Sequence, residues 1–202
     1  MPLFETSALF ILMYAYQKYT GDKSFAQQYY SLLTGYAHYL VNNGLHPSSQ
    51  LISVDAIAPK AGQTGLAVQA AIALNAASHV LGNAKYATTA ESMANSIYNN
   101  GLGLNGANPS KSTHFTYYYS DDQTWNVLFP AYSDVQLGLN TFPSAAWDMQ
   151  SKWYSSQMKQ GGLPFAGPSS YTGYINKAIE WGLADWSMYF PHRKSHMESR
   201  MC

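Results

Sequence analysis

The side chains of this chain that could serve as catalytic acids or bases are few and scattered. Charged residues make up only 11% of the 202 residues, and the formal net charge is zero. Hydrolysis of a bond such as a carboxamide needs an activated nucleophile or water and groups that stabilise the developing oxyanion. Acids in loops and at helix starts are the first candidates, because a rigid scaffold presents its chemistry there. The acids before residue 191 are Glu5, Asp22, Asp55, Glu91, Asp121, Asp122, Asp134, Asp148, Glu180 and Asp185.

The apolar residues that must position these acids recur at helical spacing almost throughout the chain. Residues 9–19 place apolar side chains on one helix face, and Gly21 ends the pattern. Asp22 is suited to cap a second helix, and the left-handed conformation available to Asn and Gly predicts its end at residues 42–44. The expected face of that helix is Phe25, Tyr29, Leu32, Leu33, Tyr36 and Leu40. Further helices are expected over 66–81, 86–100, from 121 with a bend or break at Pro130, 143–159 and 175–190.

Helices in antiparallel pairs, joined by alternating short turns and long loops, are typical of an α/α toroid. We therefore predict an all-α fold in which about seven helices form an incomplete ring over residues 1–190. A full ring at these spacings would need roughly twice this chain, so we expect unburied apolar edges that mark an interaction surface or an aggregation risk.

The two ends of the chain invite alternative interpretations. Residues 191–202 hold both arginines and the single cysteine, and they are predicted to be either a solvated basic tail or non-homologous sequence. Met1 is either a true start or an internal methionine. The opening residues lack the basic region and cleavage site of a signal peptide. The lysines before residue 190 do not cluster, and no apolar run approaches the ~20 residues of a bilayer span, so neither nucleic acid nor a membrane is an expected partner.

The most distinctive segment, residues 123–143, reads Q-T-W-N-V-L-F-P-A-Y-S-D-V-Q-L-G-L-N-T-F-P. Together with the opening residues 1–7 and the later residues 162–165, it resembles the fungal glutaminase A family, specifically the central and C-terminal all-helical domain. The resemblance runs in register from residue 1 to 190. It implies six helical hairpins in a ring and an amidohydrolase that converts L-glutamine to L-glutamate and ammonia, without a cofactor.

The resemblance also implies which acids would act. Glu5 lies in the opening motif, where the family usually shows two adjacent acids and this chain has Phe4 before Glu5. Asp55 lies where the family again tends to carry a pair, of which the first is Val54 here. Glu5 and Asp55 are therefore the catalytic candidates. The alternative for Glu5 is stabilisation of a helix N-terminus, and for Asp55 a loop cap.

The predicted substrate-binding residues are Gln63, Trp125, Tyr171 and Thr172. The loop before Gln63 lacks the histidine and asparagines of the family, and Trp125 matches a family tryptophan suited to walling a pocket or the core. Tyr171-Thr172 matches a family pair. After Leu163-Pro164 the family usually carries an Asp and an Arg, whereas this chain has Ala166 and Pro168. An Arg that could bind a substrate carboxylate through two parallel hydrogen bonds therefore has no counterpart in the family-like part of this chain.

Other patterns favour structure over chemistry. Asp121 and Asp122 fit a capping box at a helix start, and the S-x-x-K match at Ser156 lacks its partner motifs. The one i,i+4 histidine pair lies in the tail, so no metal site is expected.

Three functions remain open from the sequence. The first is the glutaminase-type hydrolase, which the family resemblance would place outside the cell as part of a longer protein. That protein would contain the missing toroid half or an upstream β-rich domain and would act on a small-molecule substrate. The second is a glycoside hydrolase-like or carbohydrate-binding toroid, which needs two facing carboxylates among Glu5, Asp55, Glu180 and Asp185. The third is a non-catalytic remnant.

Overall fold

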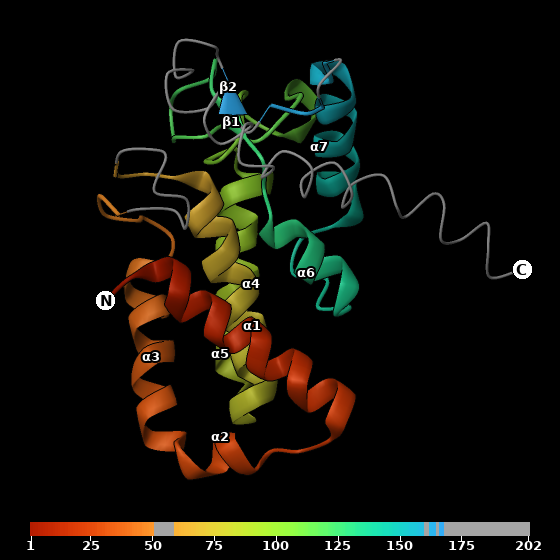
Figure 1. Ribbon diagram of the computed structural model, residues 1–202. Coiled ribbons are helices and arrows are strands. Elements are labelled where there is room, and N and C mark those ends of the chain that lie inside the picture. Colours follow the sequence, from red (N-terminus) through yellow and green to blue (C-terminus); the bar gives the residue numbers. More distant parts are fainter. Residues whose placement is uncertain (51–58, 160–161, 165, 168–202) are drawn as a thin grey trace, which may run out of the picture.

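The computed structural model describes residues 1–50, 59–159, 162–164 and 166–167, and these residues are predominantly helical (Figure 1). The all-α prediction is confirmed. The elements are α1 (Leu3–Thr20), α2 (Ser24–Gln28), α3 (Tyr30–Asn43), α4 (Thr64–Leu81), α5 (Ala84–Ala94), the π-helical turn η1 (Asn95–Asn99), the 3-10 turn η2 (Pro109–Lys111), β1 (Trp125–Asn126), α6 (Pro130–Gln136), α7 (Ser144–Gln157) and β2 (Ala166–Gly167).

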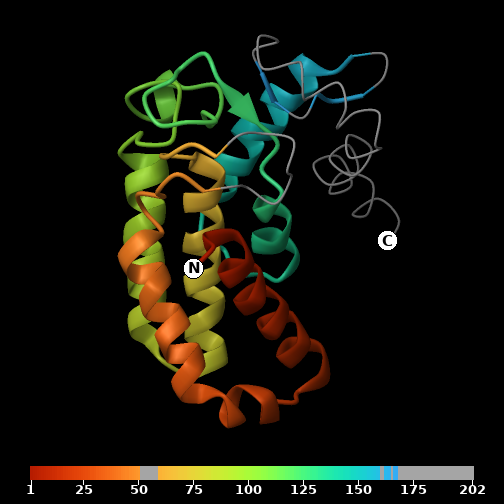
Figure 2. The same ribbon diagram turned by 60° about the vertical axis from the view of Figure 1, so that its left-hand side comes forward.

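The helices form hairpins that all open toward the same end of the molecule. In the described part of the chain, α1 is followed by α2 and α3, α4 by α5, and α6 by α7. The first helix of each hairpin runs away from the end where the long connections lie, and the second returns to it (Figures 1 and 2). We call these two ends the loop end and the turn end. Parallel first helices and antiparallel second helices are the arrangement that an α/α toroid requires.

Helix α4 is the centre of the packing. Sixteen of its residues are buried, including the small residues Ala67, Ala70, Ala71, Ala73, Ala76 and Ala77. Its closest neighbours are α1 and α5, with α3 and α6 also in contact. In the described part of the chain α4 alone has the length and mean hydropathy, 1.3, of a membrane span, and most of it is buried inside the protein. Enclosure by other helices therefore accounts for its apolar sequence.

The short turns at the turn end form as the sequence predicts. Gly21 and Gly82 follow α1 and α4 with φ of 75° and 66°, in the left-handed region that glycine enters without a Cβ clash. The Asp22 carboxylate then accepts a hydrogen bond from the Ser24 backbone N–H at 2.8 Å. The predicted boundaries of α4 and α7 and the predicted end of α1 are confirmed to within about two residues, whereas α1 begins at Leu3, six residues before the predicted face.

The second predicted helix differs from the structure in two respects. It is interrupted at Tyr29, which separates α2 from α3. Its buried residues are Ala26, Leu33, Ala37 and Leu40, whereas Phe25, Tyr29 and Leu32 of the predicted face are exposed. The small alanines face the core because α3 approaches α4 and α5 closely, so the larger aromatic side chains lie outside.

Residues 121–129 do not form the predicted fifth helix. Ser120 has φ of 59°, so it does not provide the expected capping box, and helix α6 begins only at Pro130. Trp125 and Asn126 instead form β1, which pairs antiparallel with Gly167 and Ala166 of β2. The proline is not a break within a helix but the first residue of one, where its missing N–H costs nothing. The predicted helix 175–190 and the tail 191–202 lie outside the described residues.

Gly44 ends α3 for a reason other than the one predicted. Its φ is −71°, so no left-handed conformation is needed. A Cβ at this position would lie 2.6 Å from the Leu40 carbonyl oxygen, 2.8 Å from Ala70 Cβ and 3.0 Å from Met93 Cε. Glycine is required because α3, α4 and α5 meet here.

We expect Gly44→Ala to lower the free energy of unfolding by about 1–3 kcal/mol, because the added methyl group overpacks this junction. Gly35→Ala, within α3, is the matched control. A Cβ at Gly35 would meet no atom within 4 Å. That control should raise stability by about 0.5–1 kcal/mol, as Gly-to-Ala does in a helix interior. Urea unfolding followed by circular dichroism measures both, and equal effects of the two substitutions would contradict the packing argument.

Candidate functional site

The loop end gathers the long connections between hairpins. The segment 114–119 crosses this end and is bonded on one side to the start of α4, where the Thr64 N–H donates to the Tyr117 carbonyl at 3.0 Å. On its other side the Phe115 N–H donates to Gln150 Oε1 of α7 at 2.8 Å. The Tyr119 N–H donates to the Gly62 carbonyl at 2.9 Å. This irregular, buried segment therefore fixes the loop end to two hairpins.

Glu5 lies at the loop end, in the first turn of α1. Its side chain is exposed, and the position suits a negative charge near a helix N-terminus. The start of the helix is held in place, because the Leu3 N–H donates to Gln50 Oε1 at 2.7 Å and the Tyr39 hydroxyl donates to the Met1 carbonyl. Glu5 is thus a solvent-accessible acid on a fixed backbone, and both interpretations given by the sequence remain compatible with its geometry.

Asp55 lies outside the described residues, but the two ends of its loop do not. Gln50 and Lys60 form an isolated antiparallel bridge, which brings together the chain segments that enter and leave the loop. Gln50 is also the residue that caps the start of α1. The loop that contains Asp55 therefore departs from the same end of the molecule that carries Glu5.

Gln63 is buried between these loops rather than open to solvent. Its Nε2 group donates to the backbone carbonyl oxygens of Gln50 and Lys60. Its Oε1 atom is buried and makes no hydrogen bond. Beside it, the Lys60 ammonium lies 4.0 Å from the centre of the Tyr118 ring, a cation–π distance. The geometry gives Gln63 a structural role in closing the loop and leaves one acceptor atom unused.

Trp125 belongs to a small second core at the loop end. It packs with Val127, Tyr154 and Leu163, and its ring meets Trp153 edge-on at 6.3 Å. It is 5% exposed, and a Cβ on its strand partner Gly167 would come within 2.2 Å of its indole nitrogen. The structure thus gives Trp125 a core position. Tyr171 and Thr172 lie outside the described residues, and their predicted roles stay predictions.

His114 is a buried titratable group that the sequence did not single out. Its ring stacks on Trp153 with centroids 3.9 Å apart, and its Nε2–H donates to the Thr124 carbonyl at 3.1 Å. Nδ1 lies 3.0 Å from the Thr113 hydroxyl. Burial lowers the pKa of His114, although the carbonyl contact opposes the shift. A lone histidine in a polar loop gives no periodic signal, so only the fold reveals this environment.

The other described acids do not form a facing pair. Asp134 is buried, but its carboxylate accepts from the Thr141 and Phe142 backbone N–H groups and from the Trp147 indole, so it holds the α6–α7 connection together. Asp122 and Asp148 are exposed on separate elements. In the described part of the chain no group of three or more His, Cys, Asp or Glu side chains could hold a metal ion.

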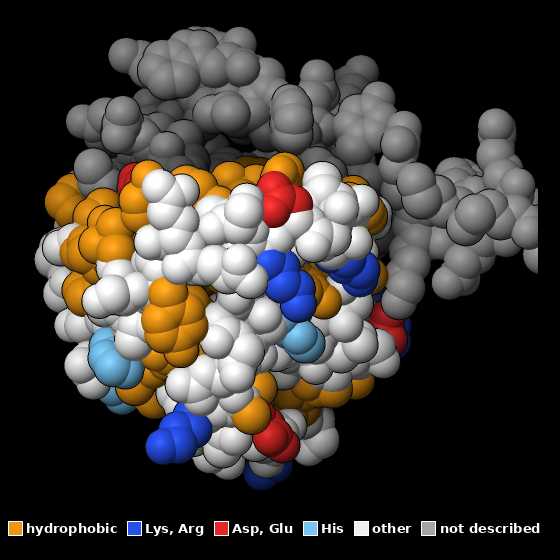
Figure 3. Space-filling view, turned by 90° about the horizontal axis from the view of Figure 1, so that it is seen from below, with side chains coloured by type: hydrophobic (Ala, Val, Ile, Leu, Met, Phe, Trp, Pro, Cys, Tyr) orange, Lys and Arg blue, Asp and Glu red, His pale blue; other side chains and the backbone are white. Residues whose placement is uncertain are grey.

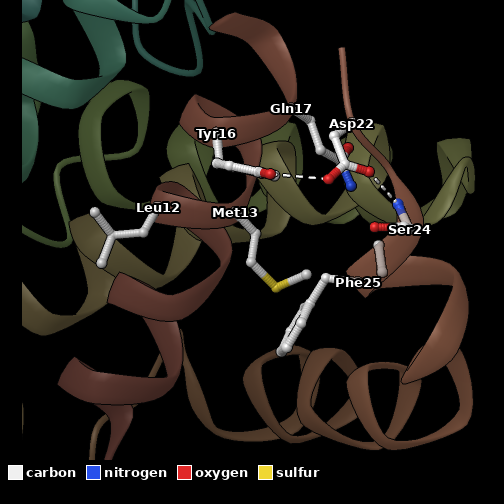
Figure 4. Close-up of a pocket in the computed structure, with 8 residues that line it drawn as sticks. Leu12, Met13, Tyr16, Gln17, Asp22, Ser24 and Phe25 are labelled. Atoms are coloured by element: carbon white, nitrogen blue, oxygen red, sulfur yellow. Dashed lines mark hydrogen bonds between the residues drawn. The ribbon is translucent and has the colours of Figure 1, made fainter. Parts of the chain in front are cut away.

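A groove of about 480 Å³ lies at the turn end, away from the segments just described. Figure 3 shows the turn end, where hydrophobic side chains lie among uncharged groups and scattered charged ones. Met13 and Phe25 point toward each other across the groove, and the Tyr16 hydroxyl donates to the Asp22 carboxylate at 2.8 Å (Figure 4). That hydrogen bond and the negative charge of Asp22 raise the pKa of Tyr16. The groove has no basic group among its lining residues and no second acid, so it offers no hydrolytic chemistry.

Comparison with known proteins places the chain in a family. The family model described as "Glutaminase A six helical-hairpin domain" matches residues 1–200. The chain belongs to this family. It is 28% identical over 192 residues to a protein of Aspergillus oryzae named Glutaminase A, covering 94% of this chain and 26% of that relative. The chain thus spans about a quarter of the relative it matches, and no solved structure is significantly similar to it.

We expect His114 to make the stability of this glutaminase A-family chain pH-dependent. Its pKa is lower in the folded state than the ordinary value near 6.5, so below that pH the unfolded chain binds the proton first. Stability is then lost as the pH falls from 6.5 through the folded-state pKa, by at most about 1.4 kcal/mol per pH unit.

Urea unfolding at pH 7.5 and 5.5 measures this slope. His114→Gln should flatten it, and the same substitution at the exposed His46 controls for removal of a histidine. An equal change of slope in both variants would contradict the assignment to His114.

Proposed function

We propose that this chain forms part of an amidohydrolase that converts L-glutamine to L-glutamate and ammonia. The observation that carries the proposal is the match of the glutaminase A family model to residues 1–200. The relative at 28% identity bears the name Glutaminase A, which names an activity for that protein. Because the chain spans a quarter of that relative, the activity is proposed for the complete protein and not for this segment alone.

In the proposed mechanism Glu5 and Asp55 are the acid–base pair. Amide hydrolysis needs one group to activate water and one to protonate the departing ammonia. The Gln50–Lys60 bridge and the cap from Gln50 to α1 support this pairing, because they attach the Asp55 loop to the end of α1 that carries Glu5. Gln63 lies between the same elements and holds the loop through its Nε2, while its unpaired Oε1 is buried and not open to a substrate.

A non-catalytic role is the second candidate, and specific residues favour it. Gln63 Nε2 is used within the protein, and Trp125 is a core residue. Ala166 is buried in β2, at the position where the resemblance implies an acid. A glycoside hydrolase-like site stays a prediction, because Asp55, Glu180 and Asp185 lie outside the described residues. Its required carboxylate pair would be one of these with Glu5, or two of them together.

We also propose that the complete protein acts outside the cell, and the family resemblance supports this location. The remaining hairpins of the ring, together with an upstream β-rich domain, are the proposed partners of this segment within that protein.

Conservative substitutions test the catalytic proposal. We expect Glu5→Gln and Asp55→Asn each to lower ammonia release from L-glutamine by about 10²–10⁴-fold in the complete protein, since each removes a proton-transfer group. Glu91→Gln and Asp148→Asn are matched controls at exposed acids of α5 and α7 and should retain activity. Circular dichroism of every variant verifies that the helices are intact.

The outcomes separate the two candidate functions. Full activity in Asp55→Asn would remove Asp55 from the mechanism. A complete protein that releases no ammonia from L-glutamine, while folded, would favour the non-catalytic role.

A further inference from the structure

The first turn of α1 has no side-chain cap of its own. Its N-cap residue is Pro2, whose ring carries no hydrogen-bond acceptor. The first N–H groups of a helix have no partner within the helix, so they need an acceptor from elsewhere. Here the acceptor for Leu3 is Gln50, 47 residues along the chain, whose Oε1 accepts from the Leu3 N–H at 2.7 Å. A residue outside α1 therefore fixes its start.

The side-chain amide of Gln50 also connects this start to α3. Its Nε2 donates to the Tyr39 hydroxyl at 3.2 Å, and that hydroxyl donates to the Met1 carbonyl. Gln50 and Tyr39 thus hold the chain on both sides of Pro2. The Leu3 side chain is fully buried, so this segment cannot shift without loss of core packing.

The backbone of Gln50 joins the same contacts to α4. Its carbonyl oxygen accepts from Nε2 of Gln63, the N-cap residue of α4, at 2.5 Å. Farther along α4, Gln69 Nε2 donates to the Phe4 carbonyl at 3.3 Å. Gln50 therefore binds the starts of both α1 and α4, the two helices that pack closely at the centre of the fold.

Glu5 lies in the turn that these contacts hold. It follows Leu3 by two residues in the first turn of α1, and its side chain is exposed. A general acid or base has to lie within hydrogen-bond reach of the proton that it transfers. A displacement of about 1 Å can lower the rate by about 10²-fold. The backbone position of Glu5 is therefore a condition for its proposed chemistry.

We infer that Gln50 is a positioning residue for Glu5. Its side-chain amide and its carbonyl together fix the first turn of α1 against α3 and α4. Gln50 transfers no proton and acts through the placement of the Glu5 carboxylate. This inference rests on the proposed catalytic role of Glu5. Its expected signature is a lower kcat at an unchanged KM, because the interaction that is lost belongs to the transition state.

Amide hydrogen exchange of the full 202-residue chain, followed by nuclear magnetic resonance, tests the contact without reference to activity. Gln50→Met should speed exchange of the Leu3 amide by about 3–30-fold, the range expected for loss of a helix cap. The Gly21 N–H, which donates to the Gln17 carbonyl at the other end of α1, is the internal control and should not change. Gln50→Glu retains an acceptor and should keep Leu3 exchange slow. An unchanged Leu3 rate in Gln50→Met would overturn the inference.

Steady-state kinetics of ammonia release from L-glutamine by the complete protein tests the consequence for Glu5. Gln50→Met should lower kcat by about 10–100-fold and leave KM within about twofold. Ser48→Ala is the matched control and should retain kcat, because the exposed Ser48 hydroxyl accepts from the same Nε2 at 3.0 Å but lies outside α1. Tyr39→Phe removes a single oxygen atom from the same contacts. It should lower kcat by about 3–10-fold even if Gln50→Met fails to fold.

The outcomes separate this inference from the proposed function. A folded Gln50→Met protein with full kcat, or with a raised KM alone, would overturn the positioning role and leave the glutaminase proposal intact. A kcat reduced equally in Ser48→Ala would do the same. A folded, complete wild-type protein that releases no ammonia would overturn the proposed function and this inference together.

Discussion

The enclosure of α4 is the constraint on which the rest of the structure depends. Its row of alanines lets α1 and α5 approach closely, and α3 and α6 fill the remaining sides. A helix surrounded in this way can expose no polar face, so its sequence lacks the usual amphipathic pattern. The lack of room for a Cβ at Gly44, beside Ala70 and Met93, follows from the close approach of α3 to α4 and α5. Small residues here set the distances between hairpins and so the curvature of the partial ring.

Hydrogen bonds donated by backbone N–H groups attach the loop end to this core. Segment 114–119 is bonded to the start of α4 through Thr64 and to α7 through Gln150. This arrangement explains why so many polar residues there are buried, among them His114, Thr116 and Thr124. A scaffold of this kind can support an exposed acid such as Glu5 on a fixed helix start, and the neighbouring Asp55 loop has its ends fixed at the same place.

The sequence predicts the parts of this fold that depend on local patterns. The left-handed glycines after α1 and α4, and the start of α7 after Pro143, follow from residue preferences alone. The exposed face of α2 and α3 does not, because a helix pattern cannot tell a core-facing alanine from a core-facing tyrosine. The sequence does not predict strand β1, because its partner β2 lies forty residues away along the chain. It does not predict the burial of His114 either, because Trp153, which stacks on the His114 ring, is distant in the sequence. For the site, Glu5 and Gln63 could be placed at the loop end, but the use of Gln63 Nε2 by two backbone carbonyls could not be foreseen.

The distribution of exposed apolar side chains supports the view that further hairpins complete the ring. Among the described residues, the exposed large hydrophobic side chains include Leu12, Tyr16, Tyr19, Phe25 and Leu32 of the first hairpin and Val135 of α6, and none from α4 or α5. The central hairpin has neighbours on both sides, whereas the first and third each have one within the described part of the chain. In a six-hairpin family whose relative is about four times as long, we propose that these side chains pack against a further helix. Replacing them by charges would then disturb the complete ring more than this segment, because the contacts they serve lie between hairpins and not within the first one.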